Sequence, residues 1–148
     1  MEQAILEPKP VQRPHPPILI GGSGEQLTLR VVARHANACN LFGDPVVVHH
    51  KLEVLQQHCE KEGREYAQIE RSNSTGLMIA KDEATLKAKK QRMQVPEPFR
   101  GFALTLPQAA ELVGLYQQAG IQTFICFSFR NEWESMQLLS EEVMPHFK

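Results

Sequence analysis

Residues 16–36 read PPILIGGSGEQLTLRVVARHA, and this stretch decides the fold. Its apolar residues 18–20 stand between prolines and glycines, a pattern typical of a short strand buried on both faces, as strands of parallel sheets are. The sequence GGSG at 21–24 interrupts this strand, and a helix is predicted over about 25–37. The stretch therefore predicts a β-α unit of a parallel sheet. The inward face of its helix is predicted to contain Leu27, Val31 and Val32.

A second strand and helix are predicted directly after the first pair. Residues 38–45, ACNLFGDP, favour a short strand closed by Gly43. Asp44 and Pro45 then predict a helix start, because aspartate caps helix N-termini and proline suits the first turn. Gly63 stands where the helix should end. The inward face of this helix is predicted to consist of Val48, Leu52, Leu55 and Cys59, which recur at helical spacing.

The remaining chain repeats this alternation. Residues 71–80 predict a third strand, and Asp82 caps a charge-rich helix to about Gln94 that is expected to present a solvated face. Residues 121–128, IQTFICFS, form the clearest buried strand. Two further helices are expected. The first begins at Pro107 and ends at Gly120, and its inward face is predicted to consist of Ala109, Leu112, Val113 and Tyr116. The second covers 133–147, and its core residues are predicted to be Met136, Leu139 and Val143. Four alternations of strand and helix predict an α/β fold with parallel β-α units.

Composition limits the class of protein. The 148 residues suffice for about one domain, and we expect a proline-rich extended lead-in over 1–17, with five of the ten prolines, before a domain over 18–148. The net charge of −1 provides no basic face for nucleic acid, and no apolar run is long enough for a membrane span. The sequence thus predicts no nucleic acid or membrane partner and a cytoplasmic location. Its three separated cysteines predict free thiols.

The turn at Gly21, Gly22, Ser23 and Gly24 is the first candidate binding site. It offers unobstructed backbone N–H groups, a hydroxyl and a following helix N-terminus, all of which suit a phosphate. It matches neither a dinucleotide-binding nor a Walker-type glycine pattern, and Glu25 places an anion beside it. From the residues alone, a phosphate site and an ordinary strand-to-helix turn both remain open. The turn at Gly43 should lie at the same edge of the sheet, where parallel sheets bind ligands.

Other chemistry has little support in the sequence. His49, His50 and His58 share one predicted helix, but no two stand three or four residues apart, so no metal site is predicted. No Ser-His-Asp set and no Gly-x-Ser-x-Gly elbow is present. Ser23 is therefore better suited to donate a hydrogen bond to phosphate than to act as a nucleophile, and no catalytic residue is assigned.

The chain also resembles a known family. The segment PKPVQRPHPPILIGGSGEQLTLRVVARHANACNLFGDP, followed by HKLEVLQQHCEKEGRE, resembles the C-terminal half of luciferase-like monooxygenases, specifically their deazaflavin-dependent oxidoreductases. The later LPQAAELVGLYQQAGIQTFICF resembles the final helix and last barrel strand of that family. Asn37 replaces a usual aspartate, and Thr105 a usual glycine.

The resemblance implies a (β/α)8 barrel that transfers hydride between an organic substrate and FMN or coenzyme F-420, a deazaflavin. It implies that Gly22, Ser23 and Gly24 hold the phosphate of this small-molecule cofactor. It also implies that a second group of residues lines the tail of the cofactor: Asn40, Leu41, Phe42 and Gly43.

A complete (β/α)8 barrel needs about 250 residues, whereas this chain has 148 and room for about four strands. We therefore expect about half of a barrel, completed by pairing of two copies in a homodimer, because a half barrel exposes two sheet edges and an apolar face. The leading hypothesis is a flavin- or deazaflavin-dependent oxidoreductase or monooxygenase. The alternatives are a catalytically inactive module that dimerises or binds a phosphate-bearing small molecule, and a fragment that pairs with a separately encoded N-terminal half.

Overall fold

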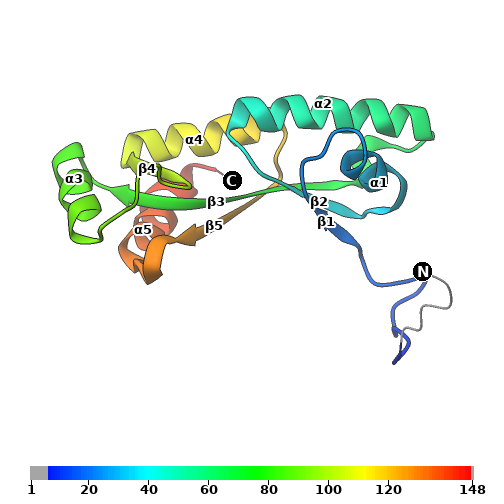
Figure 1. Cartoon of the computed structure of the whole chain (residues 1–148), viewed down its shortest axis with the longest axis horizontal. Coiled ribbons are helices and arrows are strands. Elements are labelled where there is room, and N and C mark those ends of the chain that lie inside the picture. The colour runs from blue at the N-terminus through cyan, green and yellow to red at the C-terminus, as the bar shows by residue number, and fades with distance from the viewer. Residues whose placement is uncertain (1–6, 148) are drawn as a thin grey trace.

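A parallel β-sheet with helices packed along it forms the frame of the molecule (Figure 1). The computed structural model describes residues 7–147. The ten main elements, in chain order, are β1 (Leu19–Gly21), α1 (Thr28–His35), β2 (Ala38–Leu41), α2 (Pro45–Glu62), β3 (Glu70–Ala80), α3 (Glu83–Arg92), β4 (Phe102–Thr105), α4 (Leu106–Ala119), β5 (Thr123–Ser128) and α5 (Trp133–Leu138). Short 3-10 turns occur at Tyr66–Gln68, Phe129–Asn131 and Met144–His146, and a π turn at Leu139–Val143.

The long strand β3 organises the sheet. Ser72 pairs with Asn40 of β2 on one side and with Thr123 of β5 on the other. Further along, Leu77 pairs with Phe102 of β4 and with Ser128 of β5. Since β5 occupies one edge of β3 at both points, β2 and β4 follow each other along the opposite edge. The strands β1, β2, β3 and β5 thus form a row of four, and β4 is a fifth strand that the sequence did not predict.

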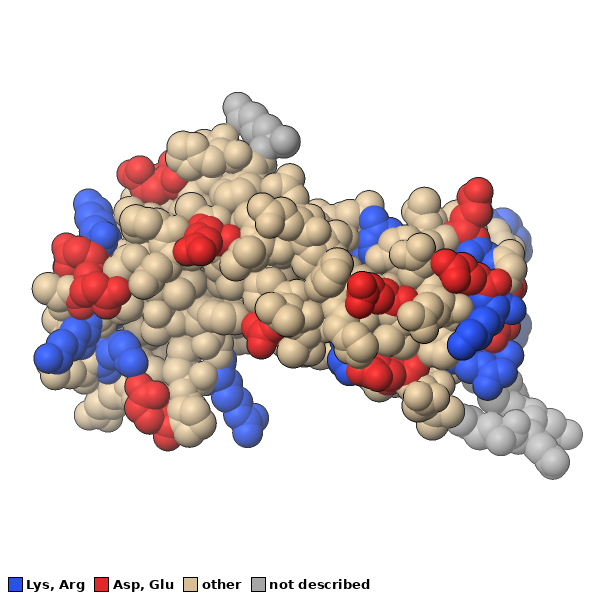
Figure 2. Space-filling model, turned by 90° about the horizontal axis from the view of Figure 1, so that it is seen from above, with Lys and Arg blue, Asp and Glu red and all other residues tan. Residues whose placement is uncertain are grey.

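The helices cover one face of this row. Cys39 and Leu41 of β2 and Leu77 of β3 belong to a single buried cluster with side chains of α1, α2 and α4. In Figure 1, α2 and α4 run along the same side of the sheet. Figure 2, seen from that side, shows positive and negative side chains mixed at both ends and few charges over the middle. We call this side the helix-covered face.

The predicted helix ends are largely confirmed. Asp44 caps α2 by accepting a hydrogen bond from Val47 N at 2.9 Å, and Gly63 ends it with φ of 67°. Asp82 caps α3 through Thr85 N at 2.8 Å. Gly120 ends α4 with φ of 100°. The inward residues predicted for α2 and α4 are all buried.

Several predictions about burial are wrong. Helix α1 begins only at Thr28 and is oriented by its buried residues Leu29, Val32 and Ala33, so Leu27 and Val31 are exposed. The strands β1 and β5, predicted to be buried on both faces, alternate between exposed and partly buried residues because each is an edge strand with one uncovered face. The last predicted helix is instead broken into α5 and two shorter turns, although Leu139 and Val143 are buried as expected.

Three smaller findings complete the fold. Cys39 and Cys59 are free and buried, and burial raises the pKa of the Cys39 thiol to about 11. Residues 7–18 contain no helix or strand, and residues 1–6 of the expected lead-in lie outside the described residues. No helix within residues 7–147 combines the length and the apolar character needed to span a membrane.

Candidate functional site

The two predicted turns lie side by side at the carboxyl ends of β1 and β2. Gly22 N donates a hydrogen bond to Asn40 O at 3.1 Å. Phe42 N donates to Ser23 Oγ at 3.3 Å. The parallel pairing of β1 with β2 places both strand ends at one edge, and these two hydrogen bonds fix the turns to each other. The structure therefore brings the glycine turn together with the end of the second strand.

Glycine is required at specific positions of these turns. Gly22 and Gly43 have φ of 133° and 127°, a region that residues with a side chain rarely adopt. A Cβ atom at Gly43 would also lie 2.9 Å from Val47 Cγ1, and one at Gly24 would lie 2.9 Å from Thr28 Oγ1. By contrast, a Cβ at Gly21 would meet nothing within 4 Å. The conformation of three of the four glycines thus depends on their lacking a side chain.

The carboxylate of Glu25 is paired with side chains of α2. Lys51 Nζ donates to Glu25 Oε1 at 2.5 Å, and His50 Nε2 lies 3.4 Å from the same oxygen. The hydrogen bond and charge of Lys51 hold the pKa of Glu25 below its ordinary value. Because this negative charge is paired, it opposes an anion at the turn less than the sequence suggested.

The residues predicted to line the tail of the cofactor, Asn40 to Gly43, lie in different environments. The side chain of Leu41 is fully buried in the core of the helix-covered face, so only its backbone can contribute to a site beside the turns. Phe42 is about half exposed. Gly43 O accepts a hydrogen bond from the hydroxyl of Tyr116 at 2.7 Å, which fixes the end of β2 to α4. Burial raises the pKa of Tyr116 to about 12, so this hydroxyl remains a donor.

Asn40 belongs to a polar cluster that the sequence analysis missed. Its Nδ2 donates to Ser74 Oγ at 2.8 Å, and its Oδ1 accepts from Ser72 Oγ at 3.1 Å. Strand register places these three side chains on the face opposite the helices, which we call the open face. The signal was the alternation of serines in RSNST at 71–75, where every second residue is small and polar. Asn40 and Ser74 are partly exposed on this face, whereas the side chain of Ser72 is buried.

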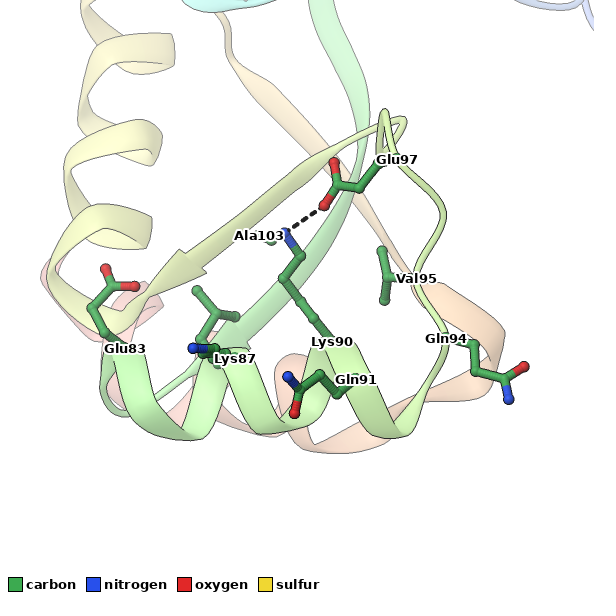
Figure 3. A pocket seen from close by; sticks show the side chains of 9 residues that line it. Glu83, Lys87, Lys90, Gln91, Gln94, Val95, Glu97 and Ala103 are labelled. Carbon is green, nitrogen blue, oxygen red and sulfur yellow. Dashed lines mark ion pairs between the residues drawn. The ribbon is translucent and has the colours of Figure 1, made fainter.

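A separate groove lies elsewhere in the structure. It has a volume of about 680 Å³ and runs along α3 between Glu83 and Val95, at the other end of the structure from β1 (Figure 3). Lys90 and Glu97 form an ion pair of 2.7 Å across it. This groove shares no residue with the two turns, so they form a surface cradle distinct from it.

The two turns present backbone groups and a hydroxyl, and none of residues 21–24 and 40–43 carries an acidic or basic side chain. Within residues 7–147 no three histidine, cysteine, aspartate or glutamate side chains gather in a way that could hold a metal ion. His49 and His50 are exposed and lie near Glu53, while His58 Nε2 lies 2.8 Å from Glu25 O. Backbone N–H groups in a glycine-rich turn are typical phosphate-binding groups.

A row of parallel strands, with helices on one face and glycine turns at the carboxyl ends, is an architecture found in part of a (β/α)8 barrel. Solved structures of larger proteins contain the same arrangement of strands and helices. The chain superimposes with a TM-score of 0.68 and 16% identity on the coenzyme F420 dependent tetrahydromethanopterin reductase from Methanopyrus kandleri, covering 89% of this chain and 51% of that one. For the long-chain alkane monooxygenase LadA the TM-score is 0.71, with 15% identity and coverage of 89% and 41%.

A third similar structure is the EDTA monooxygenase from Chelativorans sp. BNC1, with a TM-score of 0.68, 14% identity and coverage of 89% and 46%. No protein-family model and no curated protein matches the sequence. The chain thus spans about half the length, or less, of these solved structures. The expected α/β fold is confirmed, as a parallel sheet with alternating helices that matches about half of each larger chain.

Proposed function

We propose that the chain is the cofactor-phosphate-binding part of a luciferase-like oxidoreductase or monooxygenase. The observation that carries this proposal is the fixed contact between the turns at 21–24 and 40–43 at the carboxyl ends of two adjacent strands. Two solved structures with this fold are described as F420-dependent or FMN-containing enzymes, a tetrahydromethanopterin reductase and a riboflavin lyase. FMN and coenzyme F-420 both present a phosphate that such a turn would bind.

The residues present suit this role. Ser23 and Gly24 would offer backbone N–H groups to a phosphate. The N–H of Gly22 already donates to Asn40 O, so Gly22 would shape the turn, and Gly43 allows close approach from the neighbouring strand. Asn40 and Ser74 would face the part of the cofactor that lies along the open face, while the buried Ser72 would hold Asn40 in place. When bound, the cofactor supplies the hydride chemistry, and this chain supplies anchoring and orientation.

The experiment is a titration with FMN monitored by fluorescence quenching. The Ser23→Asp variant should lose at least tenfold in affinity, because its carboxylate would repel the phosphate, whereas Ser23→Asn should retain most of it. Serine 23 is preferable to Gly22 as the test position, since any side chain at Gly22 is strained by its φ of 133°. Riboflavin, which lacks the phosphate, should bind equally to both variants. Equal FMN affinity in both variants would show that the cradle lies elsewhere.

A second candidate function is a non-catalytic module that dimerises, and the open face favours it. Leu19, Ile125 and Phe127 lie on this face by strand register and are 58%, 43% and 54% exposed. The outer edges of β1 and β5 have no strand partner within residues 7–147. We propose that a second copy covers this face and pairs with these edges.

The geometry of the sheet suits such a pair. A twofold rotation about an axis parallel to the strands preserves strand direction, so β5 of one copy would meet β1 of the other in parallel. Four strands from each copy, β1, β2, β3 and β5, would then make eight. In this arrangement α5 and the following turn, with Glu134, Glu141 and Glu142, would approach α1, which carries Arg30 and Arg34.

A further inference from the structure

A small cavity at the carboxyl end of β5 stands apart from the phosphate cradle. Its volume is about 140 Å³, and its walls include Gly76, three phenylalanines and two arginines: Phe99, Phe127, Phe129, Arg100 and Arg130. By strand register, Gly76 of this cavity lies three residues further along β3 than Asn73, which pairs with Leu41 beside the glycine turns, so the cavity lies beyond those turns in the direction of the strands. None of its lining residues belongs to those turns.

The whole cavity has about the volume that a single ring needs. A protein cavity of roughly 150 Å³ lined by apolar side chains can hold one benzene molecule. The rings of Phe99 and Phe129 meet edge to face at a centroid distance of 5.6 Å, which fixes the wall. A Cβ atom at Gly76 would lie 3.0 Å from the ring of Phe127, so glycine keeps this part of the wall closely packed.

The polar part of the cavity is positively charged. Within residues 7–147 neither Arg100 nor Arg130 has a carboxylate within ion-pairing distance. Arg130 stacks on the ring of Phe129, with 5.1 Å from Cζ to the centroid, and uses one N–H group to donate to Met93 O at 3.1 Å. A guanidinium has five N–H donors, so Arg130 is held in place with donors left for a ligand.

We propose that this cavity binds an organic carboxylate whose apolar body is a single ring, with the ring between the phenylalanines and the carboxylate on Arg100 and Arg130. Guanidinium groups favour carboxylates because they form paired, charge-assisted hydrogen bonds. The site is independent of the cofactor cradle, and it is tested without any cofactor.

The test is an NMR titration of the ¹⁵N-labelled full chain with benzoate as the probe. Saturable shifts are expected at the backbone amides of Gly76, Phe127 and Ser128. Benzyl alcohol, a neutral molecule of similar size, should bind about tenfold more weakly, because it cannot form the paired, charge-assisted hydrogen bonds that a carboxylate forms with a guanidinium. Equal binding of the two probes, or benzoate shifts confined to residues 22–24, would overturn the proposal.

Two variants test whether the positive charges of the arginines are needed for benzoate binding. Arg100→Gln and Arg130→Asn should each weaken benzoate about tenfold. Asparagine suits position 130 because the backbone there is left-handed, with φ of 49°. Lys87→Gln, which removes a positive charge from the separate groove along α3, is the matched control and should leave benzoate affinity unchanged. If Arg130→Asn loses the dispersed NMR spectrum of a folded chain, Arg100→Gln provides the test instead. The side chain of Arg100 is exposed, so its replacement should leave the chain folded. Unchanged affinity in Arg100→Gln would refute the role of the arginines, while FMN affinity should be the same in every variant.

Discussion

At the scale of single residues, Lys89 shows how a local pattern can mislead. It lies on a helix with the sequence EATLKAKKQR, which predicts a solvated charged face, yet its side chain is 1% exposed. Its Nζ donates to Ile79 O at 2.7 Å and lies 3.3 Å from Glu132 Oε1 and 2.9 Å from Glu134 Oε2. The two carboxylate partners come from a segment more than forty residues later, so no periodicity within the helix could reveal them.

Glu132, the buried partner of Lys89, leads to a prediction about pH. Burial raises its pKa, but hydrogen bonds from Ser135 and the charge of Lys89 outweigh that effect and hold the pKa below its ordinary value of 4.5. A carboxyl group with a depressed pKa stabilises the folded state above the unfolded pKa, and this contribution is lost as pH falls through the folded pKa.

We therefore expect Glu132→Gln to lower the free energy of unfolding by about 2 kcal/mol at pH 7, the range of charge-assisted hydrogen bonds. The difference from the wild type should be constant above about pH 5 and shrink at more acidic pH, as urea denaturation at a series of pH values would show. The exposed Glu111→Gln, on α4, is the control and should change stability little at any pH. A difference that stays constant down to pH 3 would contradict this account.

The site residues show the same limit of sequence reasoning. The glycine turn and the end of the second strand could be placed together from the sequence, because parallel strands bring their carboxyl ends to one edge. Ser72 and Ser74 were missed because their approach to Asn40 depends on the register between β2 and β3. That register is set by packing across the whole sheet and has no marker within either strand.

At the scale of elements, helix ends were the most predictable feature. Asp44, Asp82, Gly63 and Gly120 act where they were expected, since caps depend on residues within one turn of the helix. Strand burial was less predictable. The strand IQTFICFS is apolar on both faces, but only its neighbours decide which faces are covered, and one face of β5 is not.

The N-cap of α2 can be tested directly. Asp44→Ala should lower the free energy of unfolding by about 1 kcal/mol, because Val47 N would lose its acceptor. Asp44→Asn retains a side-chain oxygen and should cost only a fraction of this amount. Urea denaturation followed by far-UV circular dichroism measures both. An equal loss in the two variants would mean that the charge, and not the hydrogen bond, is the important property of Asp44.

At the scale of the whole molecule, the two faces of the sheet differ in how they are covered. One face is buried under α1, α2 and α4, while much of the other presents Leu19, Ile125 and Phe127 beside the polar cluster of Asn40. The far end of β3 is buried on both faces, where Met78 and Ala80 pack against side chains of α3 and the loop after it. The exposed apolar area therefore adjoins both free edges of the sheet.

The proposed pairing of two copies across this face gives the last prediction. Analytical ultracentrifugation at micromolar concentration should show a dimer for the wild type. Ile125→Lys should shift it to monomer, because the charge would be buried between two sheets. Leu115→Lys is a matched control, since Leu115 is 42% exposed, close to the 43% of Ile125, but lies on α4 in the helix-covered face. It should remain dimeric. A folded wild-type monomer would refute the pairing. Dissociation of both variants would show that the interface lies on the helices and not at the sheet edges, which would also contradict the pairing.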